Sequence, residues 1–380
     1  MKVRKKNGNI GFEDFTFDET DVDNSGIQKL ITKDIMADLE PMLVGKQILH
    51  EDSALVGHPG RIRTYRKSAA VSDAIDFNAG DDVPPVGTPE VFSTVDSTPT
   101  KFGHSETVYE DAIDDMDIDA IRETETALAA GMARKADART WNEVFDATVI
   151  AAENLTAGTG AAKRFNLAHD KILEVTSLTA DFGAGAVAAV LGTDYYLDFF
   201  RGVIEFFTPV ANAYVCAIDY VYSTRTNALE ATQVRSLQRD DIVNAKTKVR
   251  STSYGKADTC VTHENQMNDL EKDERFTDAS RYGDNSVLLN GEIGKTAGIN
   301  FLVSERMWQG VAYVCQKGRR LGFYTWKKKP IVKVEELEKK SGDLNIKTWE
   351  KSNPAIVNEN YGCGIFNCHE FAKAIKSGAI

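Results

Sequence analysis

The sequence predicts an α+β protein in which a long helix, a strand-rich segment and a mixed region follow one another. Between residues 111 and 147, apolar residues recur at helical spacing. Residues 171–224 hold short runs that alternate between apolar and polar, which is typical of strands. From residue 236 onward, helical and strand patterns are mixed. A chain of 380 residues can divide its core between two or more lobes.

The charge balance and the cysteines exclude several classes of protein. A formal net charge of −12 argues against a nucleic-acid binder, which needs a basic surface to neutralise phosphates. No apolar run reaches the roughly 20 residues that span a bilayer, so we expect no membrane partner. The basic start has no apolar segment behind it, so we expect synthesis and folding in the cytoplasm. Five scattered cysteines predict free, buried thiols rather than a disulfide framework.

The first 110 residues predict segments that are not stable without a partner surface. Residues 1–50 are polar with short apolar patches, which predicts an arm that needs a partner surface. In residues 51–110, Gly60–Arg66 alternates as a strand does, and Val91–Val95 can return beside it as a long hairpin. The tip between them, Asn78–Pro89, is rich in Gly, Pro and Asp. Because a two-stranded ribbon is marginal in water, the hairpin predicts oligomerisation.

Asp111–Ala147 is the clearest helix of the chain. Its first part is crowded with aspartates, and Arg134, Lys135 and Arg139 lie toward its end. The aspartates could hold a metal, but charges in this order also suit the helix dipole, which is the simpler explanation. The apolar stripe of the helix consists of Ile118, Ile121, Leu128, Met132 and Ala136.

The strand-rich segment predicts a small β-module inserted after the helix. In its last strand, Tyr214–Tyr222, the alternate residues share one face, which we interpret as core rather than as a ligand surface. The predicted strands are Ile172–Thr176, Ala186–Val190, Val203–Phe207 and Tyr214–Tyr222.

After residue 236 the pattern predicts an α/β lobe. Asp240 or Asp241 caps a helix that carries Ile242, Ala245 and Val249 and ends near Gly255. A strand at Thr259–Thr262 and a helix at His263–Leu270 follow. The remaining predicted strands are Ile299–Ser304, Val311–Gln316, Pro330–Glu335, Asn345–Glu350 and Gly362–Asn367.

The run GEIGKT, residues 291–296, invites comparison with a phosphate-binding loop through Lys295 and Thr296. Leu289 occupies the position of the first required glycine, and the residues after Thr296 read as a strand. Without a following helix there is no helix N-terminus to hold a phosphate. The pattern therefore favours a glycine-rich turn.

Two further motifs are incomplete. His263-Glu264 begins like a zinc-protease helix, but Met267 stands where the second histidine belongs. Cys363, Cys368 and His369 lack a second ligand pair at a suitable distance. The sequence therefore predicts no catalytic residue, no cofactor-binding residue, no metal ligand and no cofactor.

The stretch from Cys260 to Arg306 carries a family resemblance. A strand at Cys260-Val261-Thr262 and a helix precede an Asp-rich turn with Phe276 and Tyr282-Gly283, and Gly291–Gly294 then leads into a strand that ends at Ser304. With the preceding arm, hairpin and long helix, this order resembles the major capsid proteins of tailed viruses, bacterial or archaeal, which have the Hong Kong 97-type fold. The resemblance spans most of residues 50–380 in architecture.

The resemblance implies a division of the chain and a structural role, with no enzyme activity. Subunits would assemble into pentamers and hexamers of an icosahedral shell around double-stranded DNA, in a virion built in the host cytoplasm. It implies a separate scaffolding protein, a portal and, in some members, a decoration protein, with no sequence-specific DNA binding. The net negative charge would repel packaged DNA and so keep it from adhering to the inner surface of the shell. The implied parts are an N-terminal arm (1–50), an extended hairpin loop (51–110), a peripheral lobe with a spine helix (111–170), an inserted β-module (171–232), an axial lobe (233–335) and a return to the peripheral lobe (336–380).

Two other functions stay open. A cellular nanocompartment shell of the same fold, similar to encapsulins, would enclose an enzyme cargo instead of DNA. A nucleotide-dependent enzyme would use Lys295 and Thr296 of the GEIGKT turn.

Overall fold

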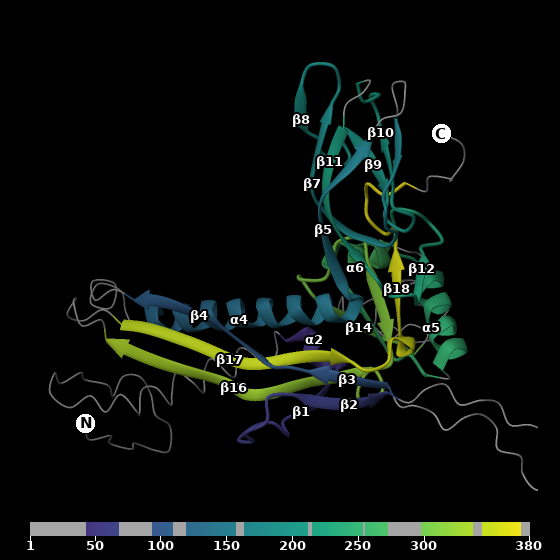
Figure 1. Ribbon diagram of the computed structural model, residues 1–380. Coiled ribbons are helices and arrows are strands. Elements are labelled where there is room, and N and C mark those ends of the chain that lie inside the picture. Colours follow the sequence, from purple (N-terminus) through teal and green to yellow (C-terminus); the bar gives the residue numbers. More distant parts are fainter. Residues whose placement is uncertain are drawn as a thin grey trace, which may run out of the picture.

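The computed structural model describes residues 43–67, 93–108, 119–156, 163–211, 215–253, 255–272, 298–336 and 344–373. These residues form a long sheet with a helix along it, an upright β-module and a five-stranded sheet flanked by two helices (Figure 1). The architecture confirms the α+β class. No helix in the described ranges is long and apolar enough to cross a membrane.

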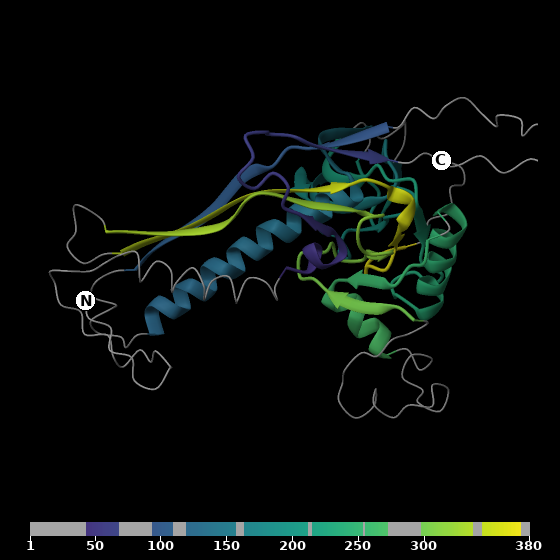
Figure 2. The same ribbon diagram turned by 90° about the horizontal axis from the view of Figure 1, so that it is seen from below.

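The long helix α4 (Asp119–Phe145) lies along one face of the long sheet, as both views show (Figures 1 and 2). Its 27 residues span about 40 Å. Leu128, Met132 and Ala136 of the predicted stripe are buried, which confirms the inward face. The aspartate-rich start, residues 111–118, lies outside the described residues. The helix ends at Phe145, where Asp146 adopts a left-handed φ of 48° and turns the chain into the next strand.

The long sheet has the order β1-β16-β17-β4, in which β1 runs parallel to β16 and the other neighbours are antiparallel. In β17, Ile346, Thr348 and Glu350 face α4 and are buried, while the alternate residues face outward. Before β1 comes the short helix α2 (Val44–Ile48), whose Gly45 packs against α4. The four strands are β1 (His50–Asp52), β4 (Thr100–Val108), β16 (Gly322–Glu336) and β17 (Leu344–Ile356).

The predicted hairpin is confirmed at its base. Strand β2 (Arg63–Lys67) pairs antiparallel with β3 (Ser93–Ser97), and β2 begins three residues and β3 two residues later than expected. The tip, residues 68–92, lies outside the described residues. The prediction that the hairpin extends to residue 110 is wrong. Strand β4 leaves the ribbon and pairs with β17, which lies more than 200 residues later in the sequence.

The β-module contains two sheets, β5-β11-β7-β8 and β6-β10-β9. The predicted face of the last strand is confirmed as core at Cys216, Ile218 and Tyr220, and Tyr214 lies outside the described residues. The predicted start at residue 171 is too late, because β5, which begins at Ala147, pairs with β11. The strands are β5 (Ala147–Thr156), β6 (Arg164–Asn166), β7 (Ile172–Asp181), β8 (Ala186–Ala188), β9 (Tyr195–Asp198), β10 (Val203–Phe206) and β11 (Val215–Ser223).

The five-stranded sheet has the order β12-β18-β15-β13-β14 and is covered by α5 (Arg239–Ser253) and α6 (Glu264–Lys272). The predicted strands and helices of this region are confirmed. Its strands are β12 (Ala228–Glu230), β13 (Thr259–Thr262), β14 (Asn300–Val303), β15 (Ala312–Cys315) and β18 (Gly362–Phe366), and a 3-10 turn at Glu359–Tyr361 precedes β18.

Two expected boundaries of this lobe are displaced. Strand β16 begins inside 233–335 but belongs to the long sheet, whereas β18 falls inside 336–380 but belongs to the five-stranded sheet. The chain crosses between the two bodies twice, and hydrogen bonding between distant strands decides each assignment. The expected cap is also different: α5 begins at Arg239, so Asp240 and Asp241 lie in its first turn. The Asp241 carboxylate accepts hydrogen bonds from the N–H groups of Thr232 and Gln238.

Candidate assembly surface

The base of the β2–β3 ribbon is fixed to the long sheet through Tyr65. Its ring stacks on Phe323 of β16 with centroids 4.1 Å apart and an interplanar angle of 7°. Its hydroxyl donates to Asp52 Oδ2 at 2.9 Å and lies 2.8 Å from Thr325 Oγ1. With Ala355 and Val357, these rings form a small apolar cluster under the ribbon. The ribbon therefore leaves the body at a defined angle.

Electrostatics stiffens this attachment. Burial alone would raise the pKa of Asp52, but hydrogen bonds from the Ala54 N–H, Tyr65 and Arg63 outweigh it and hold that pKa below its ordinary value. The Arg63 Nε lies 3.0 Å from Asp52 Oδ2. Burial and the neighbouring Asp52 raise the pKa of Tyr65 to about 12, so its hydroxyl stays a donor at neutral pH.

Most of the ribbon is uncovered. In β2 only Tyr65 is buried, and in β3 only Ser97 is. Ile62, just before β2, is 55% exposed, and Val56 near the ribbon is 45% exposed. A two-stranded ribbon with so little covered surface needs a further surface to stabilise it.

A buried carboxylate joins three parts of the body beneath α4. Asp137 Oδ1 accepts from the Gly45 N–H at 2.9 Å, and its Oδ2 accepts from Ser304 Oγ at 3.2 Å. Trp141 Nε1 donates to the same Ser304 Oγ at 3.1 Å. Burial raises the pKa of Asp137 to about 6, although its hydrogen bonds act in the opposite direction. The helix, the segment before β1 and the five-stranded sheet therefore meet at one titratable group.

A second buried carboxylate lies between α4 and the long sheet. Glu350 Oε1 accepts from Ser352 Oγ at 2.6 Å and from the Tyr324 hydroxyl at 3.2 Å. Burial raises the pKa of Glu350 to about 6, against the lowering by its hydrogen bonds and by Arg139. The Arg139 guanidinium lies over the Phe102 ring at 4.8 Å. This polar layer holds the helix in register on the sheet.

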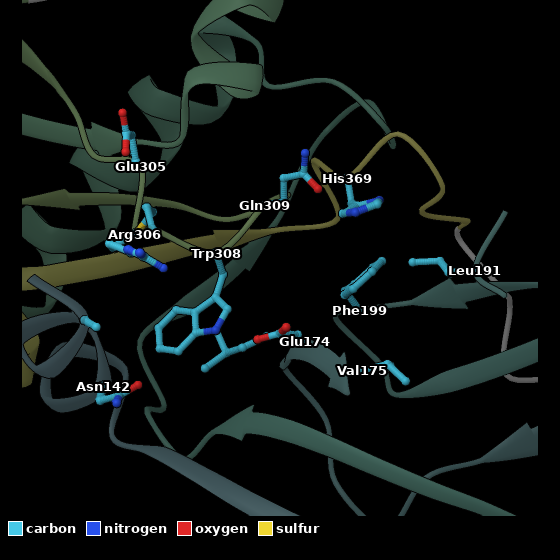
Figure 3. A pocket seen from close by; sticks show the side chains of 13 residues that line it. Asn142, Glu174, Val175, Leu191, Phe199, Glu305, Arg306, Trp308, Gln309 and His369 are labelled. Atoms are coloured by element: carbon cyan, nitrogen blue, oxygen red, sulfur yellow. The ribbon is translucent and has the colours of Figure 1, made fainter. Parts of the chain in front are cut away.

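An open cleft of about 440 Å³ lies where α4, the β-module and the turn before β15 meet. Figure 3 shows Trp308 and Glu174 in its middle, with Arg306 and Asn142 on one side and Phe199 on the other. The described residues that line it contain no Ser, Cys, Thr or Lys to serve as a nucleophile.

His369, the imidazole of that cleft, serves the local fold. It stacks on Phe199 at 5.1 Å, and its Nδ1 accepts from the Phe371 N–H. Burial lowers the pKa of His369, which favours the neutral ring.

The motifs identified in the sequence do not form a common site in the described part of the chain. Lys295 and Thr296 lie outside the described residues, and the next described element, β14, is the predicted strand rather than a helix. Cys363 and Cys368 are buried free thiols, as are the other three cysteines, which confirms the expected thiol state. His263 Nδ1 accepts from the Asn265 N–H at the start of α6. Among the described residues, no group of three or more His, Cys, Asp or Glu side chains could hold a metal.

Comparison with known proteins finds solved structures whose backbones resemble the backbone of this chain. No family model matches the sequence, and no curated protein matches it. The Cyanophage Pam1 capsid is similar over 87% of this chain and 92% of its own, with 8% identity and a TM-score of 0.49. A virus-like particle from Pyrococcus furiosus is similar over 89% and 99%, with 10% identity and a TM-score of 0.45. The SrpI encapsulin of Synechococcus elongatus is similar over 89% and 91%, with 9% identity and a TM-score of 0.45.

Identities and TM-scores this low transfer no function, so we base the fold on the elements of this chain. A ribbon rooted at Tyr65 precedes a 27-residue helix along a long sheet, followed by a β-module and a five-stranded sheet with two helices. This is the order expected of a Hong Kong 97-type subunit that carries an inserted module. The described residues have an α+β fold whose order of elements is the one that the resemblance to Hong Kong 97-type subunits predicts.

Proposed function

We propose that this chain is the major capsid protein of a tailed virus, a structural subunit that assembles into a closed shell. The observation that carries the proposal is the β2–β3 ribbon. Its base is locked by the stacking of Tyr65 on Phe323, yet every residue of β2 and β3 except Tyr65 and Ser97 is at least partly exposed. A ribbon held rigidly and left uncovered is suited to lie on a neighbouring copy, which would bury it.

The geometry supports contacts between unlike surfaces of identical copies. The ribbon and the ends of β16 and β17 near residues 336 and 344 lie well apart in both views (Figures 1 and 2). Head-to-tail contacts of this kind generate rings when the rotation closes. We infer that pentamers and hexamers form in this way and tile an icosahedral shell.

The contents of the shell decide between two functions. We favour double-stranded DNA, packaged with the help of a portal and a scaffolding protein, over an enzyme cargo as in a cellular nanocompartment. The β-module supports the viral function, because its two sheets form an extra body that projects from the long sheet (Figure 1). It offers a surface for a decoration protein.

The experiment compares the chain with a ribbon-shortened variant. Lys67 and Ser93 are directly paired, so replacing residues 68–92 with Asn-Gly can close the ribbon with a tight turn. By negative-stain microscopy, the wild-type chain, alone or with its scaffolding protein, should form closed shells or hexamer arrays. The shortened variant should stay folded by circular dichroism and form neither.

A control variant shortens the exposed turn after β7 by two residues and should assemble normally. Shells from the shortened ribbon variant would contradict the assigned role of the ribbon. A wild-type chain that stays monomeric under both conditions would contradict the proposed function. Nuclease-protected DNA inside shells from infected cells supports the virus, and a protein cargo supports the nanocompartment.

A further inference from the structure

Residues 367–373, the segment that follows β18, cross from the five-stranded sheet to the β-module. The segment begins at Asn367, which is fully buried and has a left-handed φ of 68°. It then runs beside β9, where Ala372 forms a parallel bridge with Leu197 and the Lys373 N–H donates to the Leu197 carbonyl oxygen at 3.1 Å. Figure 1 shows it as the yellow trace between β18 and the β-module. We call residues 367–373 the strap.

The β-module has a hydrophobic core of its own. The buried residues of this core lie between Leu155 and Tyr220, and Ala372 of the strap is the one buried member from elsewhere in the described part of the chain. At its base, the module contacts the core of the main body through Leu173 and Phe200. The chain also enters and leaves the module at this base, where the start of β5 pairs with the end of β11. The module is therefore a separate body that stands on one apolar base.

A buried polar network ties the beginning of the strap to both bodies. Asn367 Nδ2 donates to Asp198 Oδ1 at 3.0 Å and to Glu230 Oε1 at 3.2 Å, and Asn367 Oδ1 accepts from the Phe200 N–H at 3.1 Å. The Arg201 guanidinium binds the same two carboxylates, at 2.8 Å from Asp198 Oδ2 and 2.6 Å from Glu230 Oε2. Charge-assisted hydrogen bonds of this kind are strong and directional. The network joins the end of β9 to β12 of the five-stranded sheet.

Two cations hold the end of the strap against the module. Lys373 Nζ forms an ion pair with Glu205 of β10, and Arg235 Nε donates to the Ala372 carbonyl oxygen at 2.8 Å. Both cations lie over the ring of Tyr196 in β9, with Lys373 Nζ at 5.6 Å and Arg235 Cζ at 5.0 Å from its centre. Cation–π contacts add to the ion pair, so this end of the strap is bound through side chains.

The middle of the strap lies between two cavities. The open cleft of about 440 Å³ lies on one side, and a second cavity of about 210 Å³ lies between the strap and α6; His369 lines both. The strap crosses this gap on two rings. His369 stacks on Phe199, as Figure 3 shows, and Phe371 packs so closely on Gly192 that a Cβ there would lie 2.6 Å from the ring. With cavities on both sides, the strap can detach while both hydrophobic cores remain formed.

We propose that the strap is a brace that fixes the angle between the β-module and the five-stranded sheet, and that its release lets the module pivot on its base. The strap contacts Gly192, Tyr196 and Glu205, which lie farther from the base than Phe200 does. Contacts at the base resist separation, whereas contacts away from the base also resist tilting. Two bodies joined by a limited interface move relative to each other unless such contacts hold them. The proposal goes beyond the proposed function, because it concerns a single chain and needs no shell.

The test measures the distance between the two bodies in the unassembled chain. All five native cysteines are buried, so introduced cysteines are the sites that a thiol-specific spin label reaches. One label is placed at Ala184→Cys, in the exposed turn after β7, and the other at Asn244→Cys, on the exposed face of α5. Double electron–electron resonance then gives the distribution of distances between the labels. The parent chain should give one narrow distribution.

Two variants release the strap in different ways. One ends the chain at Cys368 and so removes residues 369–380. The other carries Arg235→Ala and Lys373→Ala, which removes the side chains that hold the end of the strap but leaves the backbone complete. Both should broaden the distance distribution at least about twofold while the far-UV circular dichroism stays unchanged, because the core of the module remains formed.

Two controls bracket these variants. Lys373→Arg keeps the positive charge opposite Glu205 and should retain the narrow distribution. Glu51→Gln removes the ion pairs with Lys46 and Lys329 in the long sheet, away from the strap, and should also leave the distribution unchanged.

Three outcomes would overturn the proposal. These are a broad distribution in the parent chain, the parent distribution in a folded double variant, and equal broadening by Glu51→Gln. The second outcome would show that the apolar base alone fixes the module. If the truncated chain does not fold, the double variant decides, since Arg235 and Lys373 are not buried. Shell formation is not part of the measurement, so a failure of the proposed function leaves its result unaffected.

Discussion

The Asp137→Asn variant should remove a large part of the pH dependence of stability. Asp137 is buried under α4, and burial raises its pKa from the ordinary 3.8 to about 6. A folded-state pKa above the unfolded value means that its contribution to stability is fully present below pH 3.8 and is lost as the pH rises through 6. The shift corresponds to about 3 kcal/mol of unfolding free energy, of which about 2 kcal/mol is lost between pH 4.5 and 7.5.

Asparagine keeps the shape and the hydrogen bonds of this site. Its carbonyl can accept from the Gly45 N–H, and its amide can donate to Ser304 Oγ, but it does not ionise. Urea unfolding of the unassembled chain at pH 4.5 and 7.5 gives the two free energies. The wild type should lose about 2 kcal/mol more than Asp137→Asn between these values, and the remaining dependence includes Glu350.

The control is Asp170→Asn, which changes an exposed aspartate and should leave the wild-type pH profile intact. If Asp137→Asn and the wild type lose the same free energy within about 0.5 kcal/mol, the raised pKa of Asp137 is refuted.

Three further predictions concern the ribbon, the thiols and one turn. Tyr65→Ala should release the ribbon base and destabilise the chain by about 3 kcal/mol, whereas Tyr65→Phe keeps the stacking on Phe323 and should cost about 1 kcal/mol; equal effects in urea unfolding would contradict the stacking. All five thiols should stay unreactive toward Ellman's reagent until denaturant is added, because they are buried and burial raises the pKa of Cys260 to about 12; fast labelling of the native chain would refute this. Gly310→Ala should lower the melting temperature, because Gly310 has a φ of 85° and a Cβ there would collide with His369; an unchanged melting temperature would contradict this packing.

Local patterns predicted the elements well. The buried stripe of α4 at Leu128 and Met132 follows from helical spacing. Strands β13, β14 and β15 appear where alternation and turns predicted them. These features depend on residues close in sequence, so the pattern contains the information.

The sequence did not predict which strands pair when they lie far apart in the chain. Strand β4 reads as a continuation of the hairpin, but its hydrogen bonds go to β17, which lies more than 200 residues later. Strand β5 joins the module through β11 for the same reason. Pairing of this kind depends on which distant strand buries the same face, and one strand pattern fits several partners.

The candidate surfaces also combine local features that the sequence predicts with contacts between distant residues that it does not. Asp137 sits on the apolar side of α4, and only the approach of Gly45 and Ser304 gives it partners. On the outer face of the long sheet, Trp349 and Lys351 alternate in the sequence and must share one face of a strand, but the pairing of Lys351 with Lys101 and Lys328 required the register of the sheet.

The most direct test of the central claim is an electron cryomicroscopy map of the particles formed by the purified chain with its scaffolding protein. The account predicts closed icosahedral shells built of pentamers and hexamers, in which the β2–β3 ribbon of each subunit lies on a neighbouring copy. A chain that stays monomeric at every concentration and with its scaffolding protein present, or a shell in which the ribbon touches only its own subunit, would contradict it.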